Sequence, residues 1–158
     1  MKHQQVILLV DGSAEDRRRV CEALSRVAPA FKCYEAGDLS TALGMLAELP
    51  IDCVLVDHLF PGGSALELIK RVADSASSSA AVVVLSGVDS EPLAARLFEA
   101  GAQEYLVKAS TDAHTLRRAI VHSLLRRRAS SRMGLGSAPE RRVQQLGAIG
   151  RFARGVAH

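Results

Sequence analysis

Five short apolar runs alternate with five stretches of helical spacing, and this alternation limits the folds open to the chain. The apolar runs span residues 6–10, 32–36, 53–56, 81–85 and 104–107. Apolar residues recur three or four positions apart over residues 16–27, 39–49, 64–72, 92–100 and 115–125, as expected for amphipathic helices. Such alternation predicts an α/β fold: a doubly wound parallel sheet of five strands with helices on both faces.

Residues that break or cap helices fall at the expected boundaries. Gly37 and Asp38 precede the second predicted helix, and Gly101 follows the fourth. Either Thr111 or Asp112 can cap the fifth. The first, third and fourth runs are apolar throughout, which is typical of strands buried on both faces of a parallel sheet.

Polar residues stand directly after four of these runs. Asp11, Asp57 and Lys108 follow the first, third and fifth, and Ser86 follows the fourth. Ligands of doubly wound folds bind at the carboxyl ends of the strands. Each residue alone is equally consistent with a helix cap, a turn or a surface charge. Their occurrence together predicts a site at one edge of the sheet.

Several spaced motifs in residues 5–125 carry a family resemblance. Leu-Val-Asp ends at Asp11 and again at Asp57, with Pro61 four residues later. Leu-Ser-Gly includes Ser86, and the run 100–108 ends in Leu-Val-Lys at Lys108. Together these motifs resemble the phosphoacceptor site of response-regulator receiver domains. The resemblance implies a flavodoxin-like sheet of strand order 2-1-3-4-5.

The resemblance also implies a role for each residue of the site. Asp57 would be the nucleophile that takes a phosphoryl group from a phosphohistidine, forming an aspartyl phosphate. Mg²⁺ would be held by Asp11, Asp57 and the backbone carbonyl of Leu59. Lys108 would pair with one phosphoryl oxygen, and Ser86 would donate its hydroxyl to another.

A switch residue is implied as well. Tyr105, three residues before Lys108, is expected to swing inward behind Ser86 and so remodel the face formed by the fourth helix, fifth strand and fifth helix.

Two positions depart from the family pattern. Receivers usually carry a second acidic residue directly after the first, where this chain has Gly12, so we expect weaker Mg²⁺ binding; Glu15 is a nearby alternative carboxylate. The residue after the lysine is usually a proline in a cis peptide, and here it is Ala109. Whether the Lys108–Ala109 bond is cis or trans stays open at this stage.

Composition favours a protein of a reducing, intracellular compartment. The three cysteines have no paired spacing, so a disulfide framework or zinc site is not expected. No apolar run reaches the roughly 18 residues of a membrane span, and a cytoplasmic location is expected. Residues 1–125 carry 12 Lys/Arg against 16 Asp/Glu, whereas residues 126–158 carry eight Arg against one Glu. This asymmetry predicts an acidic globular domain followed by a different kind of segment, and the resemblance identifies residues 1–125 as the receiver domain.

The basic segment is interpreted as a linker over 126–137 and an amphipathic helix over 138–158. No aromatic residues are interleaved with the arginines, so cations at a helix end are favoured over a nucleic-acid patch. Residues 146–158 resemble the start of a histidine-kinase phosphoacceptor helix, which would make His158 a phosphoacceptor and the helix a homodimer contact. The alternative is a terminal amphipathic helix that happens to end in histidine.

The sequence therefore predicts a phosphorelay module whose partner is a histidine kinase or a histidine phosphotransfer protein. We expect the N-terminal part of a hybrid sensor histidine kinase. The chain has no ATP-binding domain, so it would be a kinase only as part of a longer protein. The alternatives are a stand-alone response regulator and a pseudo-receiver that acts by protein contact without phosphorylation.

Overall fold

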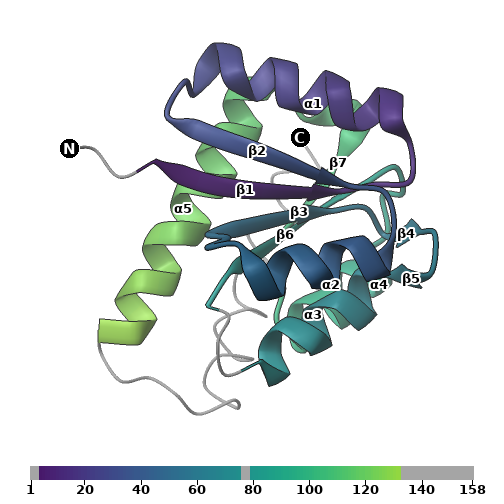
Figure 1. The fold of residues 1–158 in the computed structure, drawn as a ribbon. Coiled ribbons are helices and arrows are strands. Elements are labelled where there is room, and N and C mark those ends of the chain that lie inside the picture. The colour runs from purple at the N-terminus through teal and green to yellow at the C-terminus, as the bar shows by residue number, and fades with distance from the viewer. Residues whose placement is uncertain (1–3, 76–78, 133–158) are drawn as a thin grey trace.

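The computed structural model describes residues 4–75 and 79–132, and the side chains through residue 130. Its main sheet has five parallel strands in the order β2-β1-β3-β6-β7, from Phe31–Ala36, Gln5–Val10, Cys53–Val56, Ala81–Ser86 and Glu104–Val107. Counted along the main sheet alone, this is the predicted order 2-1-3-4-5, and the predicted fold class is confirmed (Figure 1).

Helices cover both faces of the sheet (Figure 1). On one side lie α1 (Ala14–Val27) and α5 (Ala113–Arg132). On the other lie α2 (Leu39–Glu48), α3 (Ala65–Asp74) and α4 (Glu91–Ala100). The three-residue 3₁₀ helix η1 (Lys108–Ser110) connects β7 to the start of α5.

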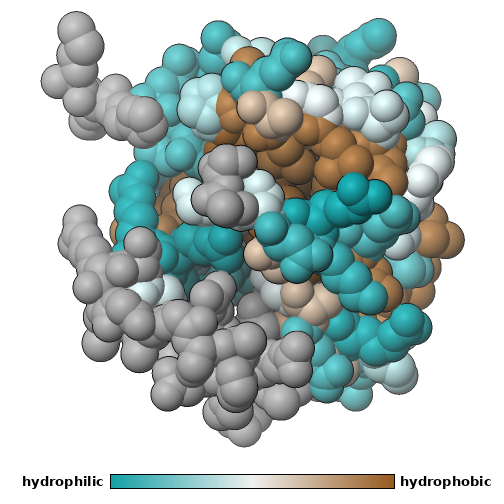
Figure 2. All heavy atoms as spheres, turned by 60° about the horizontal axis from the view of Figure 1, so that its bottom comes forward, coloured by the Kyte–Doolittle hydropathy of each residue, from teal (hydrophilic) through white to brown (hydrophobic). Residues whose placement is uncertain are grey.

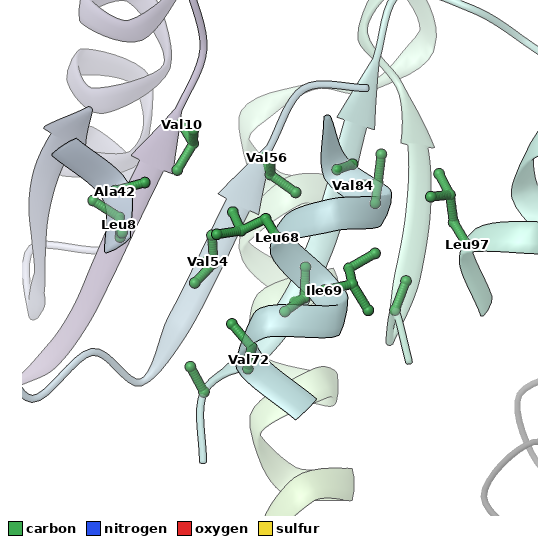
Figure 3. Packing of buried hydrophobic residues seen from close by; sticks show 14 of the residues in the cluster. Leu8, Val10, Ala42, Val54, Val56, Leu68, Ile69, Val72, Val84 and Leu97 are labelled. Carbon is green, nitrogen blue, oxygen red and sulfur yellow. The ribbon is translucent and has the colours of Figure 1, made fainter. Parts of the chain in front are cut away.

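Successive strand residues point to opposite faces, so each central strand contributes to two hydrophobic cores. Leu8, Val54 and Val84 belong to the core beneath α2, α3 and α4, which Figure 3 shows with Leu68, Ile69 and Leu97. Ile7, Leu55 and Val83 face the second core, with residues of α1 and α5 such as Leu24 and Ile120. Burial on both faces explains why these strands read as continuous apolar runs.

The helix boundaries differ from the sequence predictions where caps or tertiary contacts decide them. Helix α1 starts two residues earlier than expected, because the Ser13 hydroxyl accepts a hydrogen bond from the Asp16 N–H at 3.2 Å. Asp112 caps α5 by accepting from the Thr115 N–H at 2.7 Å. Of the two capping residues considered, Asp112 is therefore the one used.

Helix α5 continues to Arg132, seven residues past its predicted end and into the stretch assigned to a linker. Arginine side chains along this extension bind residues at the amino ends of β6 and β7, whereas the predicted site lies at the carboxyl ends of the strands. Arg126 donates to the Gln103 carbonyl at 3.0 Å and to Glu104 Oε1 at 2.9 Å, and Arg127 donates to the Ser79 carbonyl at 2.9 Å. The arginines thus bind the body of the domain, and these contacts have no local sequence signal.

A two-stranded hairpin that the sequence does not predict follows β3. It consists of β4 (Leu59–Phe60) and β5 (Gly63–Ser64), which pair antiparallel. Gly62, at the turn, has a φ of 82°, a conformation that favours glycine. The hairpin lies beside the carboxyl ends of β1 and β3 (Figure 1).

The surface carries a hydrophobic patch on the face seen in Figure 2, and the three cysteines differ in burial. On the face turned forward in Figure 2, hydrophobic surface gathers in a patch bordered by hydrophilic residues. Cys53 is fully buried, whereas Cys21 and Cys33 are only partly buried. Within the described ranges, no helix is both long and apolar enough to cross a bilayer.

Candidate functional site

The strand register brings the predicted residues to one edge of the sheet. Val10 of β1 pairs with Val56 of β3, so that Asp11 and Asp57 follow on adjacent strands. Ser86, the last residue of β6, pairs with Val107 of β7, and Lys108 comes next. Residues at the carboxyl ends of four of the five strands, β1, β3, β6 and β7, therefore meet at one edge of the sheet.

Lys108 lies at the centre of an acidic pocket. Its Nζ is 2.8 Å from Asp11 Oδ2, 2.9 Å from Asp57 Oδ2 and 3.3 Å from Asp16 Oδ2. Burial lowers the pKa of the ammonium, but the hydrogen bonds to Asp11 and Asp57 outweigh that effect and the net pKa is raised. The ammonium is therefore held in its charged form between the carboxylates.

Asp11 is the most enclosed of the three carboxylates around Lys108, with 6% of its surface exposed. Its second carboxylate oxygen, Oδ1, accepts a hydrogen bond from the Ser13 N–H at 2.8 Å. Its backbone carbonyl accepts from Arg17 Nη1 at 2.6 Å, and Arg17 also pairs with Glu35 at 3.2 Å. The side chain and the backbone of Asp11 are thus both fixed by α1.

Asp57 is more accessible, with 21% of its side chain exposed. Its Oδ1 accepts from the His58 N–H at 2.7 Å, while Oδ2 binds Lys108. The neighbouring imidazole is not simply solvated: within the described part of the chain, His58 Nδ1 is a buried atom with no hydrogen-bond partner. Asp57 combines a fixed orientation with access from solvent, which a nucleophile requires.

Ser86 and Tyr105 form a second group, joined through Val88. Ser86 is fully buried and its hydroxyl accepts from the Val88 N–H at 3.0 Å. The Tyr105 hydroxyl donates to the Val88 carbonyl, and the ring has no exposed surface. Burial raises the pKa of the Tyr105 phenol, and a hydrogen bond with Ser86 partly opposes that shift. Tyr105 therefore occupies the inward position in this structure.

The two departures from the family pattern have structural counterparts. A Cβ atom added to Gly12 would lie 2.7 Å from Cδ and 3.3 Å from Cγ of Pro61, so the hairpin loop closes the space in which a side chain would lie. The described residues contain no cis peptide bond, so the Lys108–Ala109 bond is trans. Leu59, in the same loop, is 65% exposed.

The residues present suit a hard divalent cation. Two carboxylate oxygens from adjacent strands already bind one cationic group, the Lys108 ammonium, at 2.8 and 2.9 Å. Mg²⁺ commonly uses one or two carboxylates and keeps several waters, so Asp11 and Asp57 fit it. No set of three or more His, Cys, Asp or Glu side chains in the described ranges is arranged to hold a metal ion.

Sequence reasoning missed two residues that take part in the site. Asp16 reaches Lys108, and Arg17 binds the carbonyl of Asp11. Glu15, the carboxylate considered as a substitute for position 12, instead pairs with Arg19 at 2.8 Å and its side chain is 79% exposed. No local sequence signal separates Asp16 from Glu15, because which of the two faces Lys108 depends on contacts made by Ser13 and Asp11. Residues 138–158, with the predicted phosphoacceptor His158, lie outside the described residues.

Fold and site together define a receiver-type domain of two-component signalling. The chain belongs to the response regulator receiver domain family, whose model matches residues 7–121. Among curated proteins, it is 34% identical over 103 residues to the phosphate regulon transcriptional regulatory protein PhoB of Escherichia coli, covering 65% of this chain and 44% of PhoB. It is 29% identical over 103 residues to the cyclic di-GMP phosphodiesterase response regulator RpfG of Xanthomonas campestris, covering 65% of this chain and 27% of RpfG.

Solved structures show the same architecture. The signal receiver domain of an HD domain-containing protein from Pseudomonas fluorescens superposes with a TM-score of 0.71 at 25% identity, covering 80% of this chain and 98% of that one. The chemotaxis response regulator CheY4 of Vibrio cholerae gives a TM-score of 0.68 at 21% identity, covering 76% and 98%. The chain spans less than half the length of PhoB and of RpfG.

Proposed function

We propose that the chain accepts a phosphoryl group on Asp57 from a phosphohistidine of a histidine kinase or a histidine phosphotransfer protein. The observation that carries this proposal is the partly exposed Asp57 carboxylate, with Oδ2 2.9 Å from the Lys108 ammonium and Oδ1 fixed by the His58 N–H. A carboxylate held this way is oriented for attack, and the adjacent cation offsets its repulsion from an incoming phosphoryl group.

The phosphoryl group would pass directly from the phosphohistidine nitrogen to an Asp57 oxygen, and no further reactant is needed. An Asp57 oxygen forms a bond to phosphorus as the phosphorus–nitrogen bond of the phosphohistidine breaks, and the imidazole leaves with the electron pair and takes up a proton. Lys108 then pairs with one phosphoryl oxygen, and Ser86 donates its hydroxyl to another once the β6–α4 loop moves inward. Mg²⁺, held by Asp11, Asp57 and the Leu59 carbonyl, would supply further positive charge to the phosphoryl oxygens.

We infer that the chain is the N-terminal part of a hybrid sensor histidine kinase, because residues 146–158 resemble the beginning of a kinase phosphoacceptor helix in which His158 would be the phosphoacceptor. Such helices pair in dimers, so the proposal includes a homodimer through residues 138–158. Sedimentation of the full chain and of a chain truncated after Arg132 tests the homodimer. We expect the full chain to be a dimer and the truncated chain to be a monomer. A stand-alone response regulator, the alternative suggested by the PhoB match, predicts the same oligomeric state for both chains.

A pseudo-receiver that works by protein contact alone is the second candidate, and Gly12 is the observation that favours it. Position 12 has no carboxylate, and Pro61 occupies the space next to it. This candidate predicts a folded protein that stays unmodified under conditions that phosphorylate other receivers.

The test is incubation of the full chain with a small phosphodonor, such as acetyl phosphate, and Mg²⁺. We expect one acid-labile phosphoryl group per chain in the wild type and none in Asp57→Asn, as measured by intact mass. As a control, circular dichroism should show that both proteins are folded. A folded wild type that remains unmodified at high Mg²⁺ would favour the pseudo-receiver.

A further inference from the structure

Three carboxylates surround the Lys108 ammonium, and one of them does not come from a strand end. Asp11 and Asp57 directly follow β1 and β3, whereas Asp16 lies in the first turn of α1 with Oδ2 3.3 Å from Lys108 Nζ. The Asp16 side chain is 38% exposed, against 8% for Asp11 and 21% for Asp57. Asp16 is therefore the most solvent-exposed of the three carboxylates that bind Lys108.

The position that could otherwise carry a third carboxylate is closed. A Cβ at Gly12 would meet the Pro61 ring at 2.7 Å, closer than real Cβ contacts come. A proline ring cannot rotate out of the way as a flexible side chain can, so the hairpin loop itself would have to move. In this backbone, any further negative charge for the pocket has to come from another element.

The Asp16 carboxylate cannot make the capping hydrogen bond that its position in α1 would otherwise allow. With Ser13 at the N-cap of α1, Asp16 stands where a capping box would direct its carboxylate to the Ser13 N–H. That N–H is donated to Asp11 Oδ1 instead, at 2.8 Å. The first turn keeps only half of the box, the Asp16 N–H to Ser13 Oγ bond at 3.2 Å, and the Asp16 carboxylate faces Lys108.

The neighbouring carboxylate provides a contrast on the same helical turn. Glu15 pairs with Arg19, four residues along the helix, and both side chains are more than two-thirds exposed. Glu15 and Asp16 carry the same charge and differ in what they face, so they form a matched pair for mutagenesis.

We propose that Asp16 is a positioning residue that holds the Lys108 ammonium in the pocket and supplies the negative charge that Gly12 cannot. This inference rests on the proposed phosphorylation of Asp57, for which Lys108 would have to be in place. Losing Asp16 would release one of three contacts to Lys108 and remove one unit of charge. Both changes weaken binding of a divalent cation, because a freed ammonium competes more strongly for Asp11 and Asp57.

Two measurements on the full chain test the proposal, using D16N with E15Q as the matched control. The first is the rate of Lys108 acetylation by acetic anhydride, followed by peptide mass spectrometry; we expect D16N to raise it about threefold and E15Q to leave it unchanged. The second is the Mg²⁺ dissociation constant by calorimetry; we expect D16N to raise it about three- to tenfold.

An acetylation rate in D16N equal to that of the wild type would overturn the proposal, as would an unchanged Mg²⁺ dissociation constant. If the wild type binds no Mg²⁺, the acetylation rates alone decide. Neither readout requires phosphoryl transfer, so failure of the proposed function, in which Asp57 stays unmodified, is seen separately with the phosphodonor.

Discussion

At the scale of single residues, one ammonium neutralises a pocket in which three carboxylates meet. Lys108 has 26% of its side chain exposed, and its main partner Asp11 has 8%. Asp11 is too enclosed for water to replace a lost cation fully. The site therefore depends on Lys108 for stability as well as for its proposed chemistry.

Replacing Lys108 by methionine tests that dependence. The change keeps most of the aliphatic stem and removes the charge, leaving Asp11 and Asp57 to repel each other. We expect the free energy of unfolding to fall by about 1–3 kcal/mol, at the lower end of values for buried pairs because Asp57 is partly solvated. Urea unfolding measures this, with Lys70→Met on the exposed side of α3 as the control. Equal losses in both variants would contradict the assigned role.

The pH range of this contribution follows from the raised pKa of Lys108. Because the folded-state pKa lies above the ordinary value of 10.5, the contribution is fully present below about pH 10 and is lost as pH rises towards the folded-state pKa. The stability difference between wild type and Lys108→Met should thus be constant from pH 7 to about pH 9.5 and shrink above that. Urea unfolding at several pH values would count against the account if the difference already narrowed between pH 7 and pH 9.

Gly12 is a second residue at which a substitution should lower stability, because Pro61 lies against it. Alanine there would place Cβ 2.7 Å from Pro61 Cδ. The crowding should outweigh the usual entropic gain of replacing glycine, so that Gly12→Ala lowers the unfolding free energy by about 1–3 kcal/mol. Adding Pro61→Ala should recover part of that loss in a double-mutant cycle. Additive effects of the two changes would show that the contact does not matter.

At the scale of elements, the extension of α5 is stabilised by contacts between its arginine side chains and residues distant in sequence. Arg126 bonds to the Gln103 carbonyl, to Glu104 Oε1 and, at 3.4 Å, to Ser123 Oγ. These contacts tie α5 to the start of β7, the strand that carries Tyr105 and leads into Lys108. The helix and the site are thus connected through one short strand.

We expect Arg126→Ala to lower the unfolding free energy by about 0.5–1.5 kcal/mol, mainly through the lost hydrogen bond to a backbone carbonyl, since the ion pair with Glu104 is partly exposed. Arg128→Ala is the matched control: its one described contact, to Gln5 Oε1, is 3.5 Å long and exposed, so the change should stay within about 0.5 kcal/mol. Thermal or urea unfolding distinguishes the two. Identical values would mean that α5 does not depend on Arg126.

The β6–α4 loop is the second element with a specific anchor. Its residue Val88 donates its N–H to Ser86 and accepts from the Tyr105 hydroxyl through its carbonyl. Ser86→Ala should speed amide hydrogen exchange at Val88 about five- to tenfold, because a bond of about 1 kcal/mol is lost. The amide of Leu93, which binds the Ser90 hydroxyl at the start of α4, should exchange unchanged. An unaltered Val88 rate would contradict the anchor.

At the scale of the whole molecule, the sheet order and the location of the site could be predicted because both follow from one pattern. Strands buried on both faces read as apolar runs, and polar residues directly after Val10 and Val56 must lie at the carboxyl edge of a parallel sheet. The roles of Asp16 and Glu15 could not be predicted, since they depend on which acceptor takes the Ser13 N–H. The hairpin at Leu59–Ser64 is too short to show periodicity, and the end of α5 depends on contacts distant in sequence.

The most direct test of the central claim is to locate the phosphoryl group after reaction with acetyl phosphate and Mg²⁺. Reducing the aspartyl phosphate with borohydride converts the modified residue to homoserine, which peptide mass spectrometry can place. We expect homoserine at Asp57 alone, with Asp11 and Asp16 unmodified. Homoserine at Asp11 or Asp16, or none in a folded protein, would contradict phosphorylation of Asp57.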